Sequence, residues 1–377
     1  MDTALGEDGP SRTTRTSGAC GYLTINLAAL ERNYERLAKE VAPARAAAVV
    51  KADAYGLGAS KIGATLYARG CRHFFTAQFV EAVRLRPHLD KDALIFVLNG
   101  LQPGNEPDCA REGIVPVINS LEQWQRWSTQ AQTLGRRLPA VLQFDTGMSR
   151  LGLPPEERGA VAAALGMGGT VEVLFIMSHL ASADDFESGQ NGDQLAEMTR
   201  IAQEFAGFDI CFANSGGVFL GSNYHGVLAR PGIALYGGAP TAGVPNPMEQ
   251  VVQLEVAIVQ LRTVPAGARV GYGGTHVASV ETRLATVAAG YADGLPRSLS
   301  GKGALYCDGV RLPIVGRVSM DSVTIDVTAL PAGRLSLGSL VEVLGPNQTL
   351  EDIARDAGTI SYEILTGLGD RYDRHYR

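Results

Sequence analysis

Between Arg45 and about Gly238, short apolar runs alternate with stretches that have the periodicity of amphipathic helices. This alternation is typical of βα units packed around a parallel sheet. The chain has eight such runs, and eight parallel strands are the number that closes a (β/α)8 barrel. The runs begin near Ala46, Phe74, Leu94, Ile114, Ala140, Val171, Ile210 and Val227. We therefore expect residues 21–245 to form an α/β domain with the architecture of a TIM-like barrel.

After Pro247 the pattern changes to β-rich runs separated by Gly and Pro turns. Residues 246–377 are therefore expected to form a second, mainly β domain. Its one helical segment follows Thr349, a plausible N-cap with Asp352 at the third helical position. An extra strand is expected within residues 21–28, where it can pair with the second domain. Residues 1–20 lack an apolar stretch and are expected to form a flexible leader without a signal sequence.

Composition narrows the classes of function. A chain of 377 residues with 45% hydrophobic and 19% charged content is long enough to bury the cores of two domains. A net charge of −6 gives no reason to expect nucleic acid or an anionic membrane as a partner. The five cysteines are scattered, without a C-x-x-C pair, which favours neither disulfides nor a metal site. No segment is apolar enough to span a membrane, so we expect a soluble, cytoplasmic protein that acts on small molecules.

Polar residues that follow the apolar runs are the candidates for chemistry, because a barrel of this kind builds its active site at the carboxyl ends of its strands. Lys51 ends the first run, and Arg150 and His179 follow the fifth and sixth. Ser215 follows the seventh run, and Arg230 lies in or just after the eighth. Loops after the last two strands of such barrels often bind phosphate. These residues are therefore expected to meet at one rim.

Two local patterns have a direct chemical meaning. A lysine desolvated at the end of an apolar strand loses its proton more readily, and can then form a Schiff base with an aldehyde cofactor. The backbone N–H groups of Ser215, Gly216 and Gly217 would open a short helix towards a phosphate, because glycine allows close approach and the helix dipole favours an anion. Each pattern alone is weak, since most lysines after strands are solvated and most Ser-Gly-Gly segments are turns.

The chain resembles the alanine racemase family from about Gly21 to Arg377. AVVKADAYGLG, which contains Lys51, is similar to the segment by which that family attaches pyridoxal phosphate (PLP). Further similar segments follow in order along the chain: TGMSRLG, SHLASAD, ANSGG, RPGIALYG, VGYGGT, AGYADG, GRVSMD and ISYE. Nine ordered segments are too many for chance agreement. The resemblance implies a fold-type III PLP enzyme that interconverts L- and D-alanine.

The resemblance also implies how PLP is held. Lys51 would carry the cofactor, and Arg230 would hydrogen-bond its pyridine nitrogen. Because arginine does not give up its proton, that nitrogen would stay unprotonated and the ring would be a weaker electron sink. The other cofactor contacts implied by the resemblance are Tyr55, Ser215, Gly232, Ile233 and Tyr362. No metal ion is implied.

Racemisation needs a proton removed from one face of the α-carbon and returned to the other, so two acid–base groups must flank it. The resemblance assigns these roles to Lys51 and Tyr272. His179 and Arg230 would support catalysis by relaying positive charge towards the phenol of Tyr272. The substrate carboxylate would be bound by Arg150 and by the backbone N–H of Met320. The implied gate of the substrate channel consists of Tyr291, Asp184, Arg297, Arg317 and Ile360.

The resemblance implies a homodimer whose active sites are shared, with Tyr272, Tyr291 and Met320 supplied by the partner's β domain. One departure concerns Gln143, seven residues before Arg150, where many family members have a lysine that becomes carbamylated and braces the arginine. An amide brings no negative charge, so the bracing of Arg150 is left open.

Several alternatives remain. The nearest is a racemase for serine, lysine or arginine, because such enzymes share the PLP machinery, although the bulk of Tyr362 favours a small substrate. A PLP decarboxylase of the same architecture and a non-catalytic PLP-binding module are less favoured, given the VGYGGT segment and the second domain. The sequence leaves open whether D-alanine is made for peptidoglycan or alanine is catabolised.

Overall fold

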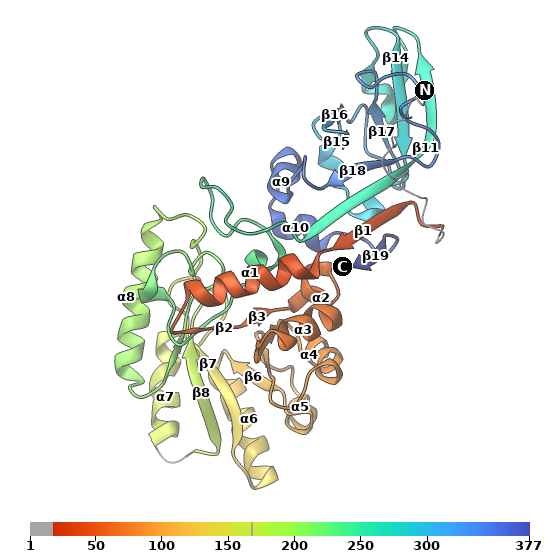
Figure 1. The fold of residues 1–377 in the computed structure, drawn as a ribbon. Helices are drawn as coiled ribbons and strands as arrows, with labels where there is room; N and C mark the ends of the chain where they lie inside the picture. Colours follow the sequence, from red (N-terminus) through yellow and green to blue (C-terminus); the bar gives the residue numbers. More distant parts are fainter. Residues whose placement is uncertain (1–17, 167–168) are drawn as a thin grey trace, which may run out of the picture. The chain divides into compact units, whose positions relative to one another are not determined.

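The computed structural model describes residues 18–166 and 169–377, which divide into two compact units (Figure 1). One unit contains residues 25–252 with residues 360–366 and Arg377. The other contains the described residues up to Thr24 together with residues 253–359 and 367–376. Both units are therefore assembled from separate stretches of the chain. The leader expected at residues 1–20 lies almost entirely outside the described residues.

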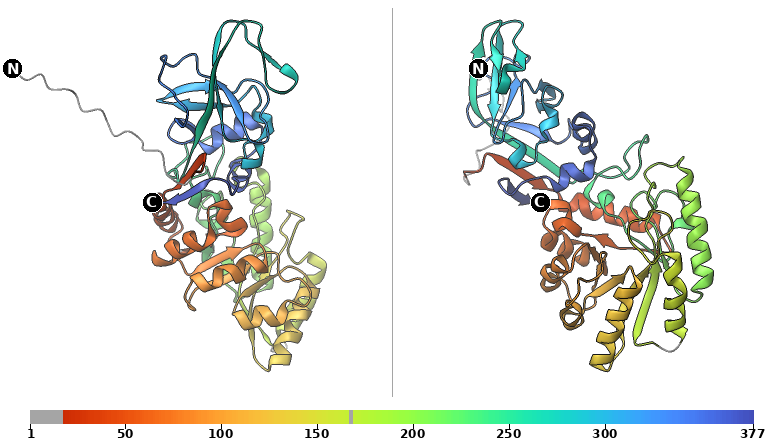
Figure 2. Two further views of the ribbon diagram at one scale, coloured as in Figure 1. Left: turned by 90° about the vertical axis from the view of Figure 1, so that its right-hand side faces the viewer. Right: turned by 180° about the vertical axis from the view of Figure 1, so that it is seen from behind.

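The larger unit is built on a seven-stranded parallel sheet whose strands follow one another in chain order from β3 to β9. Two further short strands, β10 and β2, also pair in parallel. Figure 2 shows these strands from two further directions. The bounds are β2 Arg45–Ala46, β3 Ala48–Val49, β4 His73–Thr76, β5 Leu94–Val97, β6 Val115–Ile118, β7 Leu138–Gln143, β8 Val171–Met177, β9 Ile210–Cys211 and β10 Leu228–Ala229. All eight predicted strands are present, each starting within two residues of its expected position.

Backbone hydrogen bonds close this sheet into a barrel. The segment around β10 bonds the first strand on one side, where Arg45 N donates to Val227 O at 2.9 Å and Ala47 N to Ala229 O at 2.8 Å. On its other side, Val227 N donates to Ile210 O at 2.8 Å. The predicted fold class, an α/β barrel of the TIM type followed by a mainly β region, is confirmed.

Helices lie between successive strands of the barrel (Figure 1). Helix α6 illustrates how the sequence determines where a helix begins and ends. Ser120 caps its first turn by accepting a hydrogen bond from Gln123 N at 3.2 Å, and Gly135 ends it with a φ of 62°. The bounds are α1 Leu27–Glu40, α2 Lys51–Gly56, α3 Ala59–Ala68, α4 Phe79–Leu85, α5 Glu106–Glu112, α6 Leu121–Leu134, α7 Pro155–Gly166, α8 Gly189–Glu204 and α10 Ser361–Thr366.

The barrel core is aromatic on the side of its first strands. Phe75 and Phe96 are fully buried and stack with their ring centroids 4.6 Å apart. All four residues of β4 are buried, as expected for a parallel strand covered on both faces. The core thus fixes the strands whose carboxyl ends carry the polar residues described below.

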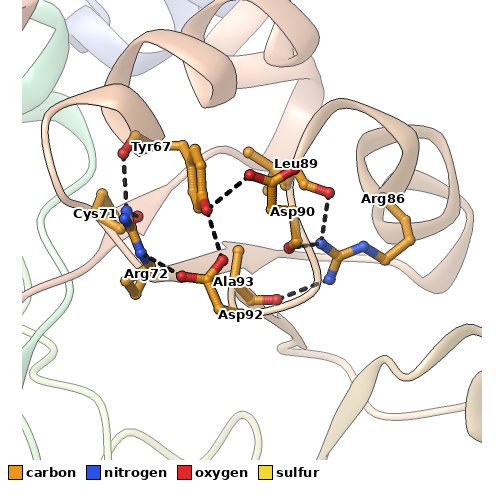
Figure 3. Close-up of polar contacts among 8 residues, drawn as sticks. All are labelled: Tyr67, Cys71, Arg72, Arg86, Leu89, Asp90, Asp92 and Ala93. Atoms are coloured by element: carbon orange, nitrogen blue, oxygen red, sulfur yellow. Dashed lines mark hydrogen bonds and ion pairs between the residues drawn. The ribbon is translucent and has the colours of Figure 1, made fainter.

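A polar cluster fastens the opposite, amino-terminal ends of β4 and β5 (Figure 3). The Tyr67 hydroxyl donates to Asp92 Oδ1 at 2.6 Å and lies 3.1 Å from Asp90 Oδ2. Arg72 Nε donates to the other oxygen of Asp92 at 2.8 Å, and its guanidinium lies 4.1 Å from the Tyr67 ring centroid. Because this rim lies away from Lys51, we assign the cluster to stability of the fold.

The second unit contains an eight-stranded sheet in which β1 lies between β11 and β19. Strand β1 therefore lies between a strand that opens the second β-rich stretch and one from the end of the chain. The bounds are β1 Gly21–Ile25, β11 Val252–Val264, β12 Arg269–Val270, β13 His276–Val277, β14 Thr282–Val287, β15 Ala304–Cys307, β16 Val310–Pro313, β17 Val323–Asp326, β18 Leu340–Leu344 and β19 Asp373–Tyr376.

The predicted helix of this unit is present as α9 (Leu350–Ala357). Thr349 is its N-cap, and the Thr349 and Asp352 side chains bond each other's backbone N–H in a capping box, as predicted. Helix α10 was not predicted, and it groups with the barrel unit. Among the described residues, no helix is long and apolar enough to span a membrane.

Candidate functional site

Lys51 lies directly after β3, at the rim of the barrel formed by the carboxyl ends of the strands. Its ammonium group is partly buried, and this burial lowers the pKa of Lys51 below its usual value. The nearby guanidinium groups of Arg150 and Arg230 lower it further, while the carboxylate of Glu81 opposes them. A lysine in this environment loses its proton more easily, which is what a nucleophilic amine requires.

The four residues after Lys51 form a left-handed turn. Ala52, Asp53, Ala54 and Tyr55 have φ values of 52°, 52°, 54° and 58°, although none is glycine. L-amino acids adopt this conformation at a cost, so surrounding contacts must hold it. Glu81 of α4 accepts a hydrogen bond from Ala52 N at 2.7 Å, and Asp53 Oδ1 accepts one from Ala59 N at 2.7 Å. The turn buries Tyr55 beneath the loop that follows the last strand.

Arg230 is buried and held from three sides. Its Nη1 donates to Cys211 O at 2.9 Å, and its Nη2 donates to Ser178 O at 2.6 Å. Its Nε makes no hydrogen bond to the described residues and remains an available donor. The guanidinium also lies 5.9 Å from the ring centroid of Phe75. Arg230 therefore presents one N–H group from a fixed position.

His179 is neutral in this setting. Burial lowers the pKa of His179 to about 3, and the positive charges of Arg230, Arg150 and Lys51 add to the effect. Because Arg230 carries a permanent charge, the imidazole remains unprotonated beside it. The structure thus brings Lys51, Arg150, His179 and Arg230 close enough to influence one another electrostatically, as the strand count predicted.

Ser215, Gly232 and Tyr55 form a compact cradle. The Ser215 hydroxyl accepts from Gly232 N at 2.8 Å, and Ser215 is buried. A Cβ atom at Gly232 would lie 2.2 Å from the Tyr55 hydroxyl, so only glycine fits there. The backbone N–H groups of Ser215, Gly216 and Ile233 make no hydrogen bond within the described residues. An anion bound beside Ser215 would find several unused donors.

One detail of this cradle differs from the sequence prediction. Residues 215–219 form successive turns instead of a helix. Gly217 N donates to Asn214 Oδ1 at 2.9 Å, so this N–H is not free for an anion. The Asn214 side chain caps the turn. The N–H of Gly217, which was predicted to bind the phosphate, is therefore already hydrogen-bonded to a neighbouring side chain.

Arg150 lies on the loop after β7 and is exposed. Gln143 is buried at the end of β7, yet no hydrogen bond joins the side chains of Gln143 and Arg150 in the part of the chain that the structure describes. The backbone before Arg150 is instead ordered by Asp145, whose Oδ1 accepts from the N–H groups of residues 147, 148 and 149 at 2.9 to 3.1 Å.

Tyr362 reaches the same region from α10. Its ring centroid lies 5.9 Å from that of Tyr55. Burial and the neighbouring carboxylate of Asp184 raise the pKa of Tyr362 to about 12, so its phenol stays protonated. Asp184 itself is exposed, and Ile360 is 60% exposed.

The other unit gathers the remaining predicted residues on neighbouring loops. Tyr291 N donates to Ser319 O and Ala292 N to Met320 O, both at 3.0 Å, which joins the loops of Tyr291 and Met320. Gly273, next to Tyr272, faces the guanidinium of Arg317, which a Cβ atom would meet at 3.3 Å. Tyr272 is 71% exposed, Met320 52% and Tyr291 44%. Arg297 is also exposed and begins a short 3₁₀ helix, Arg297–Leu299.

Several residues that hold these loops show no signal in the sequence. In the second unit, Arg371 bonds Asp321 at 2.7 Å and Asp293 at 2.6 and 2.9 Å. This gives Asp321, which follows Met320, a structural partner. Asp293 in turn accepts from Gly290 N at 2.9 Å, next to Tyr291. The partners lie 50 and 78 residues apart in sequence, so no local pattern could have indicated them.

Comparison with known proteins agrees with this geometry. Residues 25–240 match the model for the alanine racemase N-terminal domain, and residues 251–376 match that for the C-terminal domain. A catabolic alanine racemase of Rhizobium johnstonii is 72% identical over the full length of both chains. A catabolic alanine racemase of Agrobacterium fabrum is 59% identical, covering 97% of this chain and 94% of the relative.

A solved structure gives the same result. The alanine racemase of Bartonella henselae, with covalently bound pyridoxal phosphate, matches with a TM-score of 0.92 and 43% sequence identity. The match covers 95% of this chain and all of that one. With both domains matched and relatives well above 30% identity over their full length, this chain belongs to the alanine racemase family.

Proposed function

We propose that this chain interconverts L- and D-alanine with PLP as its cofactor. The observation that carries the proposal is Lys51, whose pKa is lowered at the rim of the barrel and which is followed by a left-handed turn. Strained backbone held in place by side chains is typical of functional sites. Membership of the family and the relatives' names support alanine as the substrate.

The residues present fit PLP. Unused N–H groups beside Ser215, together with the hydroxyls of Ser215, Tyr55 and Tyr362, suit a phosphate, and Gly232 and Ile233 complete this cradle. Lys51 would attach the aldehyde, and the free Nε of Arg230 would donate to the pyridine nitrogen. When bound, PLP supplies a conjugated ring that makes the α-hydrogen of an amino acid more acidic.

Lys51 and Tyr272 would move the proton on opposite faces of the α-carbon. The lowered pKa of Lys51 favours its role as a base. For Tyr272, we propose a contact with neutral His179, which in turn contacts Arg230. That arrangement would bring the positive charge of Arg230 to bear on the phenol and ease the loss of its proton.

Tyr272 would come from a second copy of the chain. A phenol that is 71% exposed on a loop is available for a partner, and Tyr291 and Met320 are exposed on neighbouring loops. We therefore propose a homodimer in which each site combines the barrel of one chain with these loops of the other. The second domain would then be needed for catalysis, which argues against a PLP-binding module without activity.

The substrate carboxylate would bind Arg150 and the backbone N–H of Met320, which makes no hydrogen bond within the described residues. A guanidinium provides two parallel donors for a carboxylate. Tyr362 would limit the length of the substrate side chain, which favours alanine over serine, lysine or arginine. Access would be controlled by gate residues with exposed side chains: Tyr291, Asp184, Arg297, Arg317 and Ile360.

The test is a direct comparison of racemisation of alanine, serine, lysine and arginine by the PLP-loaded protein, followed by chiral chromatography. We expect alanine to have the highest kcat/KM and the Lys51→Ala variant to be inactive, with the near-visible absorbance of the attached cofactor lost. Greater activity on serine, lysine or arginine would assign a different racemase, and release of carbon dioxide without racemisation would assign a decarboxylase.

The physiological direction is proposed on the relatives alone. The names of the two relatives from Rhizobium and Agrobacterium favour alanine catabolism over supply of D-alanine for peptidoglycan. We also propose that the enzyme works in the cytoplasm, where free thiols such as those of its five cysteines stay reduced.

A further inference from the structure

One face of α8 carries a row of polar side chains that are directed at the barrel rim. Gln190, Gln194 and Glu197 are three or four residues apart, which places them on the same side of the helix. Gln194 is fully buried, with no exposed surface. A buried amide must have its hydrogen bonds satisfied, so its partners define what it does.

The amide of Gln194 joins two loops at the rim. Its Nε2 donates to the backbone oxygen of His179 at 2.8 Å and to Thr146 Oγ1 at 3.0 Å. Its Oε1 accepts from Ala181 N at 2.8 Å. Thr146 precedes Arg150 on the loop after β7, and its hydroxyl lies 2.7 Å from that of Ser178. One side chain thus fixes the backbone of His179 relative to the loop of Arg150.

Neighbours on α8 hold the same loop by its backbone. Gln190 Nε2 donates to Gly147 O at 3.1 Å. Glu197 pairs with Arg158 at 2.6 Å, and Arg158 Nη2 donates to Asp145 O at 2.9 Å. Gln190 and Gln194 therefore contact the segment that leads to Arg150 directly, and Glu197 reaches it through Arg158.

These contacts bear on the bracing of Arg150, which the sequence left open at Gln143. No hydrogen bond joins the side chains of Gln143 and Arg150 within the described chain, so the Arg150 loop is held by other contacts. The adjacent Ser149 has a φ of 55°, a conformation that is uncommon for residues other than glycine. The Asp145 bonds and the α8 contacts hold the backbone of this loop.

We propose that Gln194 is a positioning residue, which sets the distance between the Arg150 loop and His179 without touching the substrate. The proposal rests on the proposed roles of Arg150 and His179. Loss of the Gln194 bonds would leave Arg150 and His179 intact but let the loop move. The affinity for the substrate carboxylate would then fall by a larger factor than the rate of proton transfer at Lys51.

The test uses Gln194→Met, which keeps the length of the side chain and removes its hydrogen bonds, in the PLP-loaded enzyme. We expect KM for alanine to rise about ten-fold while kcat falls by less than about three-fold. The inhibition constant of propionate, a carboxylate of the same length without an amine, should rise by a similar factor. Gln203→Met, at an exposed position of the same helix, should leave all three constants unchanged.

A second variant separates positioning from folding. Thr146→Val keeps the volume of the side chain and removes the hydroxyl that links Gln194 to Ser178. It should also raise KM for alanine, and in the double variant the two effects should not multiply, because both changes break one connection. If Gln194→Met does not fold, Thr146→Val alone must raise KM.

The results that would contradict the proposal differ in what they exclude. Gln194→Met with a lower melting temperature but unchanged KM and propionate inhibition would reduce Gln194 to a structural residue. Independent effects that multiply in the double variant would also contradict the proposal. The Arg150→Ala variant is measured in the same assays. If it leaves KM and propionate inhibition unchanged, the proposed carboxylate site is wrong. If Arg150→Ala changes these constants but Gln194→Met does not, only the positioning role of Gln194 is refuted.

Discussion

The guanidinium of Arg230 lies against the thiol of Cys211, with Nη1 3.0 Å from Sγ and 2.9 Å from the carbonyl oxygen of the same residue. Both residues are buried, and burial raises the pKa of the Cys211 thiol, so it stays neutral. Cys211 therefore orients Arg230 without cancelling its charge. If Arg230 holds the pyridine nitrogen as proposed, Cys211 would therefore affect the binding of PLP.

This relationship predicts the effect of Cys211→Ala. Removing the thiol leaves a small cavity and one fewer acceptor for Arg230, so PLP affinity should fall about three-fold and stability by about 1 to 2 kcal/mol. Cofactor titration and urea unfolding would measure the two effects. Cys109→Ala is the matched control, because Cys109 is equally buried and its thiol bonds the Ile114 carbonyl, away from Arg230. It should lose stability and keep its PLP affinity; equal affinity loss in both variants would contradict the role of Cys211.

A second prediction concerns the size of the substrate. The ring of Tyr362 lies against that of Tyr55, so Tyr362→Asn should open space beside the proposed substrate side chain. We expect the ratio of kcat/KM for serine to that for alanine to rise about ten-fold. Tyr362→Phe retains the ring and should keep the wild-type ratio. An Asn variant with an unchanged ratio would show that another residue limits side-chain size.

Stability at acidic pH should depend on His73. Burial lowers the pKa of His73 to about 4 in the folded protein, with a further contribution from Arg45. Since the unfolded histidine titrates near pH 6.5, the folded state is fully favoured above that value and loses stability as pH falls from about 6.5 towards 4, by up to about 3 kcal/mol. The ring stacks on Phe96 with an interplanar angle of 5°, so a phenyl ring can replace it.

The measurement is urea unfolding of the wild type and His73→Phe at pH 8, 6 and 5. The wild type should lose more stability between pH 8 and 5 than the variant does. His88→Asn changes an exposed histidine and should follow the wild type. Parallel loss of stability in wild type and His73→Phe would rule out His73 as a source of acid sensitivity.

Some parts of the structure followed from sequence patterns because their causes are local. Apolar runs located the eight strands, and the capping residue Thr349 located the start of α9. The left-handed turn after Lys51 could not be predicted in this way, because Ala52 and Tyr55 disfavour positive φ and only contacts such as that of Glu81 hold it. Where tertiary contacts impose another conformation, the backbone preference of the individual residues no longer predicts the structure.

In the candidate site too, some residues could be predicted from local sequence and others could not. Lys51 and Ser215 were predictable because each follows an apolar run or begins a recognisable segment. Gln194 was not, since its partners Thr146 and His179 lie 48 and 15 residues away and only the packing of α8 on the rim brings them together. The unpredicted helix α10 is only six residues long, too short for a helical period to stand out.

The most direct test of the account is subunit complementation between Lys51→Ala and Tyr272→Ala. Each variant alone should be inactive, because each lacks one of the two proposed bases. In a mixed dimer with shared sites, one site carries both substitutions and the other carries neither, so random exchange should restore roughly a quarter of wild-type alanine racemisation. Mixed dimers are isolated by placing different tags on the two chains, which confirms that exchange has occurred. Isolated mixed dimers that recover activity support two bases from two chains, whereas confirmed mixed dimers without activity would show that Tyr272 does not act in the partner's site.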